Sequence, residues 1–316
     1  MRIDRGSLAE LRPQGPCVLT MGSFDGLHLG HRALIRRVLE VAREQGRQAL
    51  LLTFEPHPRE VLTDDRPPVA RLTLEEEKLE LLEATGLDRV VLLRFTPELA
   101  DWEPERFVSE GLLARIGMRH LVAGDNHAFG RRRRGDQDTL RRMAGQLGFG
   151  LDLLGPVLVD GERVSSTRVR QALLAGQAEL ATSLLGRPFR LTGRVGHGHG
   201  RGRELGFPTA NLVVDARQLL PADGVYAVGV RLADGRRRGG MLNLGPRPTF
   251  GETERTAEVH VLGLDDSLYD QALKVDLLTF IRDTIQFQNG EQLTDQLRQD
   301  RNRIQEWLEA HPGALG

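Results

Sequence analysis

The chain has 316 residues, enough for two domains, and its hydrophobic (40%) and charged (28%) fractions are ordinary for a globular protein. Its formal net charge of −1 provides no overall field that would attract nucleic acid or an anionic membrane. The single cysteine, Cys17, cannot form an internal disulfide, and no apolar run approaches the length of a membrane span. Because the N-terminus also lacks an apolar signal core, these features predict a cytoplasmic protein.

The first predicted strand, residues 17–21, breaks at Gly22 and leads through Ser-Phe-Asp-Gly-Leu-His-Leu-Gly-His into a helical pattern that ends at Gly46. The first N–H groups of a helix are unpaired and its dipole favours negative charge, so this turn predicts an anion site. His28 and His31 are three residues apart and therefore lie on one side of the first helical turn. Two imidazoles beside these amides suit a phosphate group whose charge shifts during displacement.

The rest of the first half alternates strand and helix patterns, which predicts a parallel sheet covered on both faces. Thr73 and Glu76 form a capping-box pattern for a helix that runs toward Gly86. Further strands are predicted at 49–54, 89–95 and 120–123, and a helix that opens at Pro104 precedes the last of these. Ligands of such sheets bind beyond the carboxyl ends of the strands, and the histidine turn lies at one such end.

The loop after strand 120–123, from Gly124 to Gly130, leaves the predicted sheet at the same edge as His28. Asp125 and Asn126 could form an ordinary turn there. Four arginines, Arg131 to Arg134, follow. Such a run is typical of solvated surface or, alternatively, forms a cationic rim that gathers phosphates; without interleaved aromatic residues it does not indicate a nucleic-acid patch.

A short hairpin is predicted at 157–164, around Asp160 and Gly161. The next residues, Ser165-Ser-Thr-Arg-Val-Arg170, open a helical pattern whose hydroxyl groups can cap the helix. An arginine one turn into this helix, Arg170, can also neutralise a polyphosphate through two hydrogen bonds.

A domain boundary is predicted at Gly186, which gives domains 1–186 and 187–316. Beyond it, short β-rich segments separated by glycine turns predict a small antiparallel barrel. The predicted strands are 190–195, 224–231, 239–243, 257–262 and 274–280, with a hairpin turn at Asp234-Gly235. A final amphipathic helix over 291–310 is expected to pack against the barrel.

The segment 193–211 is rich in glycine, so it can close over phosphates with its backbone amides or can be a plain surface loop. We interpret His197 and His199 as surface histidines rather than metal ligands, because no third ligand stands at a suitable spacing. Thr209 and Asn211 offer neutral oxygen atoms that suit Mg²⁺.

Glu258 lies within an apolar strand, where burying an unpaired carboxylate is costly, and this favours a function over a structural role. The alternative is that Glu258 faces solvent on a half-buried strand.

The turn at residues 22–31 resembles the GxFDGxHxGH signature of the HxGH nucleotidyltransferases, and within them the adenylyltransferase module of bacterial bifunctional riboflavin kinase/FAD synthetases. The loop 124–130 is similar to the family's second motif, with His127 where phenylalanine is usual, and 165–170 is similar to its ISSTxIR motif. In the second half, Pro208–Asn211 matches the PTAN motif of riboflavin kinases. Three more segments resemble motifs of the riboflavin kinases: 243–250 matches NxGxxPTF, 257–261 matches ExH, and 280–282 matches a Phe-x-Arg segment. Asp270 departs from the Tyr-Gly pattern of the kinases.

The resemblance implies a Rossmann-like α/β nucleotidyltransferase domain and an all-β kinase barrel with a terminal helix. Its catalytic residues would be His28, His31 and Glu258, the last as the base. ATP would be bound in the first domain by Gly22, Phe24, Asp25, Gly30, Asn126, Ser166, Thr167 and Arg170. ATP would be bound in the barrel by Gly198, Gly200, Gly206, Pro208, Thr209 and Asn211, with the metal at Thr209 and Asn211 and the flavin at Asn243 and Arg282.

The implied reactions are phosphorylation of riboflavin to FMN and adenylylation of FMN to FAD, with ATP as co-substrate, Mg²⁺ as cofactor, and FMN and FAD as products rather than prosthetic groups. The expected partners are these small molecules, without nucleic acid or membrane, and self-association is left open. Two alternatives remain: a monofunctional adenylyltransferase with an inactive flavin-binding barrel, and a nucleic-acid-binding member of the HxGH superfamily.

Overall fold

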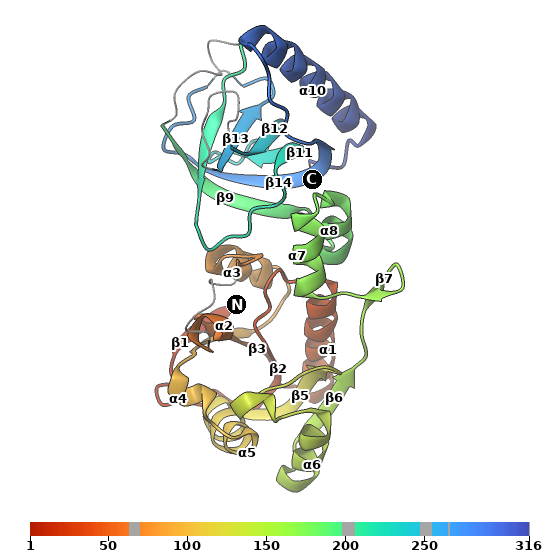
Figure 1. Cartoon of the computed structure of the whole chain (residues 1–316). Coiled ribbons are helices and arrows are strands. Elements are labelled where there is room, and N and C mark those ends of the chain that lie inside the picture. The colour runs from red at the N-terminus through yellow and green to blue at the C-terminus, as the bar shows by residue number, and fades with distance from the viewer. Residues whose placement is uncertain (63–69, 198–205, 247–254, 265, 316) are drawn as a thin grey trace. The chain divides into compact units, whose positions relative to one another are not determined.

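The computed structural model describes residues 1–62, 70–197, 206–246, 255–264 and 266–315 (Figure 1). Its contacts divide the chain into two compact units: Met1–Val69 with Thr73–Ser165, and Ala70–Leu72 with Ser166–Gly316. The two helices between residues 166 and 185 are thus grouped with the second unit. The domain boundary after residue 186 stays a prediction.

The first unit contains a parallel sheet of six described strands in the order β1-β4-β3-β2-β5-β6. Its strands are β1 (Arg2–Gly6), β2 (Cys17–Met21), β3 (Gln48–Glu55), β4 (Arg89–Arg94), β5 (Met118–Gly124) and β6 (Gly150–Leu154). The four central strands confirm the sequence prediction, and their near-continuous burial reflects a sheet covered on both faces.

Helices cover both faces of this sheet, as Figure 1 shows. Side chains of α1 (Leu29–Gln45) and α3 (Glu75–Glu83) form one apolar core with the sheet, and those of η1 (Phe107–Ile116) and α6 (Gln137–Leu147) form the other. Helix α1 ends at Gly46, whose φ of 60° is a left-handed conformation that favours glycine. The remaining short elements of this unit are α2 (Pro58–Leu62), α4 (Pro97–Ala100), α5 (Pro104–Arg106), η2 (Arg131–Arg133) and the predicted hairpin β7 (Leu158–Val159) and β8 (Glu162–Arg163).

The capping box predicted at Thr73 and Glu76 is wrong. Helix α3 begins at Glu75 after Leu74, and no side chain caps it. The hydroxyl group of Thr73 instead bonds the turn that follows β2. The Thr73 hydroxyl group, which the local sequence pattern assigned to the cap of the helix, therefore forms a tertiary contact instead.

The second unit contains a closed antiparallel barrel, with six described strands in the order β10-β13-β12-β11-β14-β9. They are β9 (Phe189–Gly196), β10 (Ala210–Val214), β11 (Gly224–Arg231), β12 (Arg237–Gly245), β13 (Thr256–Val261) and β14 (Ala272–Arg282). Two helices, α7 (Ser166–Leu174) and α8 (Ala178–Leu185), precede the barrel. The turn at Asp234-Gly235 joins β11 to β12, as predicted.

The terminal helix α10 (Gly290–Ala310) lies along the outside of the barrel (Figure 1). Its Ile304 is fully buried in a cluster with Val225, Ala227 and Met241 of the barrel strands. This confirms the predicted packing. In the part of the chain that the structure describes, no helix has both the length and the apolar character needed to cross a membrane.

Candidate active sites

The turn between β2 and α1 brings the two predicted histidines into direct contact. His28 is the N-cap of α1, and its Nδ1 accepts a hydrogen bond from the backbone N–H of His31 at 3.3 Å. The two rings stack with centroids 3.6 Å apart and planes 15° from parallel. Gly30 permits this arrangement, because a Cβ there would come within 3.1 Å of the His28 ring.

Both imidazoles are neutral at pH 7. Burial lowers the pKa of His28 to about 4, against the opposing effect of the Asp25 carboxylate. Burial and the neighbouring His28 hold the pKa of His31 well below its ordinary value. Since Nδ1 of His28 accepts a hydrogen bond, its proton is on Nε2, where it can be donated to a ligand oxygen.

The turn itself is held in a strained conformation. Phe24 and Leu27 have φ angles of 47° and 44°, which are unusual for residues with a side chain. Thr73 supports the turn, since its backbone N–H donates to Asp25 Oδ1 at 3.1 Å and its Oγ1 accepts from the Gly26 N–H at 3.1 Å. Asp25 is buried at this contact.

Two further side chains hold the same turn and were missed by the sequence analysis. Lys78 Nζ and Thr53 Oγ1 both donate to the carbonyl oxygen of Ser23, at 3.0 and 3.2 Å. Lys78 is buried and is one of only two lysines among 43 basic residues. That rarity was the available signal, because a compact ammonium group differs from the arginines used elsewhere.

The second predicted loop follows β5, which pairs with β2 in parallel, so both loops leave the same edge of the sheet. Asn126 is exposed there, and Asp125 forms two contacts with the guanidinium group of Arg163, which lower the pKa of Asp125. His127 lies against Phe129 with ring centroids 5.7 Å apart, and burial lowers its pKa to about 4. The imidazole is therefore a neutral aromatic ring, as the family's phenylalanine would be.

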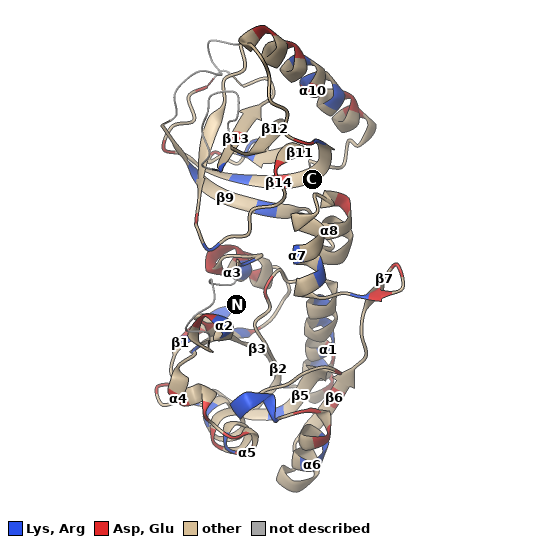
Figure 2. Cartoon of the chain, in the orientation of Figure 1, with Lys and Arg blue, Asp and Glu red and all other residues tan. Residues whose placement is uncertain are grey.

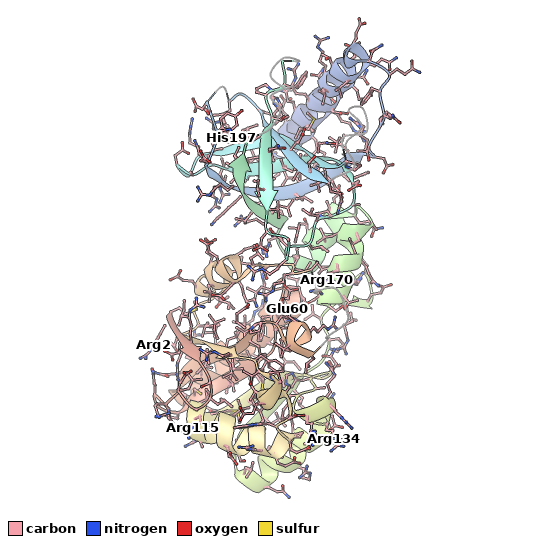
Figure 3. The ribbon with its side chains drawn as sticks, turned by 60° about the vertical axis from the view of Figure 1, so that its left-hand side comes forward. Arg2, Glu60, Arg115, Arg134, Arg170 and His197 are labelled. Carbon is pink, nitrogen blue, oxygen red and sulfur yellow. The ribbon has the colours of Figure 1, made fainter. Side chains whose placement is uncertain are left out.

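The arginine run lies on the surface of the first unit (Figures 2 and 3). Arg131 is 3.5 Å from Asp101 and 3.4 Å from Glu103, and Arg134 is 3.7 Å from Glu103. Two of the four charges are thus partly compensated by nearby carboxylates. This supports solvated surface more than a site for an external polyanion.

The third predicted motif begins helix α7 in the second unit, with Ser166 at its first position. Arg170, labelled in Figure 3, donates from Nε to the carbonyl oxygen of Ala70 at 3.0 Å. Thr167 is exposed. The ATP-binding roles given to these residues stay predictions.

In the barrel, three predicted residues lie in one row across adjacent strands. Glu258 of β13 is paired in register with Asn211 of β10 on one side and with Asn243 of β12 on the other. Directly paired residues of antiparallel strands project to the same face, so a carboxylate lies between two side-chain amides. All three side chains are half-buried.

The PTAN segment leads into this row. Pro208 and Thr209 are exposed immediately before β10, and Gly206 has a φ of 77°. Arg282, assigned to the flavin, forms a hydrogen-bonded ion pair with the buried Asp300 of α10, at 2.7 to 3.0 Å. Its flavin contact stays a prediction. Gly198, Gly200, His199 and residues 247–250 lie outside the described residues.

The donor atoms near this row fit a magnesium ion that keeps water and substrate phosphates as ligands. Thr209 offers a hydroxyl oxygen and Asn211 an amide oxygen, both hard neutral donors. Within the described residues there is no cluster of three or more histidine, cysteine or acidic side chains that could enclose a metal by itself.

Fold and sites together define a two-domain transferase, in which a nucleotidyltransferase-like parallel sheet and a kinase-type antiparallel barrel occur in one chain. The model of the FAD synthetase family matches residues 11–168, and that of the riboflavin kinase family matches residues 185–308. The chain belongs to the bifunctional riboflavin kinase/FMN adenylyltransferase family.

Curated relatives with that name match almost end to end. The relative from Escherichia coli strain K12 is 39% identical over 296 residues, 94% of each chain. The relative from Pseudomonas fluorescens is 41% identical over 302 residues, 95% of this chain and 96% of its own. A crystal structure titled macrolide-efflux protein, from Streptococcus pneumoniae, has a TM-score of 0.89 at 29% identity and covers 97% of this chain and 100% of its own, so it shares the fold.

Proposed function

We propose that the chain uses two ATP molecules in succession, first to phosphorylate riboflavin to FMN in the barrel and then to adenylylate FMN to FAD with release of pyrophosphate. Family membership over both halves supports the pair of activities. The observation that carries the proposal is that the chain holds both a stacked histidine pair at a helix N-terminus and a glutamate between two asparagines. A protein with an inactive barrel would have no need of the second arrangement.

In the kinase step, Glu258 accepts the proton of the riboflavin 5′-hydroxyl group as that oxygen bonds to the γ-phosphorus of ATP. The bond from the γ-phosphorus to the bridging oxygen breaks, and ADP leaves. Asn211 and Asn243 flank the carboxylate and orient it by their places in the same row. A magnesium ion bound by Thr209 and Asn211 would neutralise phosphate charge.

In the adenylyl transfer step, a phosphate oxygen of FMN bonds to the α-phosphorus of ATP and the bond to pyrophosphate breaks. The backbone N–H groups at the start of α1 and the Nε2–H of His28 stabilise the charge that develops on the phosphate oxygens. Neither step needs a covalent protein intermediate, because the protein supplies in-line positioning and charge stabilisation. This accords with Cys17, which is fully buried and whose pKa is raised to about 12 by burial.

A product assay tests the proposal. The full chain is incubated with riboflavin, ATP and Mg²⁺, and flavins are separated over time. We expect FMN to appear first and FAD to follow. Formation of FAD from added FMN, with no FMN formed from riboflavin, would instead establish the monofunctional alternative. Omission of Mg²⁺ in the presence of a chelator tests the cofactor.

A further inference from the structure

His260 lies two residues after Glu258 on β13. Its Nδ1 is 2.9 Å from the carbonyl oxygen of Pro208, in the segment that carries Thr209. A carbonyl oxygen only accepts hydrogen bonds, so Nδ1 is the donor. Burial lowers the pKa of His260, which leaves this neutral tautomer in place at pH 7.

This hydrogen bond acts on the residue that follows Pro208. The carbonyl group of Pro208 and the N–H group of Thr209 belong to one planar peptide unit. Fixing the carbonyl oxygen therefore fixes the direction in which the chain enters Thr209. The proline ring also fixes the φ angle of Pro208, which further limits the backbone conformations open to this segment.

The same imidazole also holds the residue before the proline. The ring of Phe207 meets the His260 ring edge-on, with centroids 5.4 Å apart, and Arg301 of α10 lies 5.5 Å from the centroid of the Phe207 ring. Phe207 is buried in the apolar cluster between barrel and helix. The ring of His260 thus contacts the buried Phe207, while its Nδ1 bonds the exposed Pro208.

Strand register connects this contact to the proposed chemistry. Glu258 and His260 are separated by one residue on the same strand and so project to the same face. The pairing of β10 with β13 begins at Ala210, which is opposite Val259, and Thr209 lies just before it. The register of β10 and β13 does not reach Thr209, and the hydrogen bond from His260 to Pro208 holds that end of the segment to β13.

We propose that His260 is a positioning residue for the kinase reaction, which sets Thr209 relative to Glu258 by donating a hydrogen bond to the Pro208 carbonyl group. The inference rests on the proposed function of the barrel. It assigns no contact between His260 and substrate. The hydrogen bond, rather than the bulk of the ring, positions Thr209.

Two substitutions separate these contributions. His260→Phe keeps an aromatic ring against Phe207 and removes the donor. His260→Asn removes the ring and keeps an N–H donor at the same distance along the side chain as Nδ1. We expect His260→Phe to lower kcat for FMN formation about tenfold and to raise KM for Mg·ATP, with KM for riboflavin unchanged. His260→Asn should recover most of the loss.

The assay contains its own controls. FAD formation from added FMN should be the same in both variants and the parent chain, and thermal unfolding shows whether the barrel remains folded. Parent-like kinetics in His260→Phe would overturn the inference, as would an equal loss in His260→Asn, because that would identify ring packing as the cause. If the parent chain itself made no FMN, the proposed function rather than this inference would have failed.

Discussion

The ring of His31 lies on the ring of His28 at a centroid distance of 3.6 Å, while the backbone N–H of His31 is bonded to the Nδ1 of that same partner. The pair is therefore fixed before any ligand binds. A preorganised donor loses little conformational freedom on meeting a phosphate group.

Replacing His28 with asparagine should abolish FAD formation and leave FMN formation intact. Asparagine is a good N-cap, so helix α1 keeps its first hydrogen bond and the free energy of unfolding should change by less than about 1 kcal/mol. The Nε2 donor is lost, and we expect the rate of FAD formation from FMN to fall at least about 100-fold. Separate assays of the two products on one preparation measure this. Loss of both activities in a folded variant would contradict the assignment of two sites.

The same pair makes the stability of the first unit depend on pH. The pKa of His28 is about 4 in the folded chain against an ordinary value of 6.5, so between these values the unfolded chain binds more protons. Stability from this residue is complete above pH 6.5 and is lost as the pH falls toward 4, by about 3 kcal/mol.

Urea unfolding at pH 7 and pH 5 measures this effect, and His28→Asn is the matched variant because it cannot titrate. The parent chain should lose more stability than the variant between these two values. An equal loss in both proteins would show that other groups control the acid response.

The central strands were predictable because they are buried on both faces, but the two outer strands were not. Strands β1 and β6 form the edges of the parallel sheet, and none of their residues is fully buried. Edge strands need less apolar surface, so their sequences carry a weak pattern. Strand β10 was not predicted for another reason: the glycine-rich stretch before it favoured a loop.

The sequence named candidate site residues but could not show which of them lie side by side. Strand register, which sequence spacing does not reveal, places Asn211 and Asn243 on either side of Glu258. Asp270 stands where the family's pattern has glycine, and its φ of 62° lies in the left-handed region, which glycine adopts freely and aspartate tolerates. The supports at Thr53, Thr73 and Lys78 come from distant segments, and only the fold brings them to the turn.

Replacing Glu258 with glutamine should stop FMN formation and leave FAD formation from FMN unchanged. Glutamine keeps the size of the side chain and one acceptor oxygen between the two asparagines, but it cannot act as a base. Loss of a general base reduces kcat by about 100- to 10,000-fold. Glu306→Gln, at an exposed position on α10, is the control for a charge change in the same unit. Undiminished FMN formation in Glu258→Gln would remove the base from the proposed mechanism.

Replacing Thr73 with valine should weaken the histidine turn from a distance. Valine has nearly the shape of threonine and keeps the backbone hydrogen bond to Asp25, but it has no hydroxyl group to accept from the buried Gly26 N–H or to donate to the buried Asp25 carboxylate. An unpaired buried polar group costs about 1–3 kcal/mol, so urea unfolding should show a loss of that size. FAD formation should fall with it, because Phe24 and Leu27 hold strained φ angles that need this support. Thr73→Ser keeps the hydroxyl group and should behave almost as the parent chain does; if serine proved as damaging as valine, loss of the hydroxyl hydrogen bonds would not account for the effect.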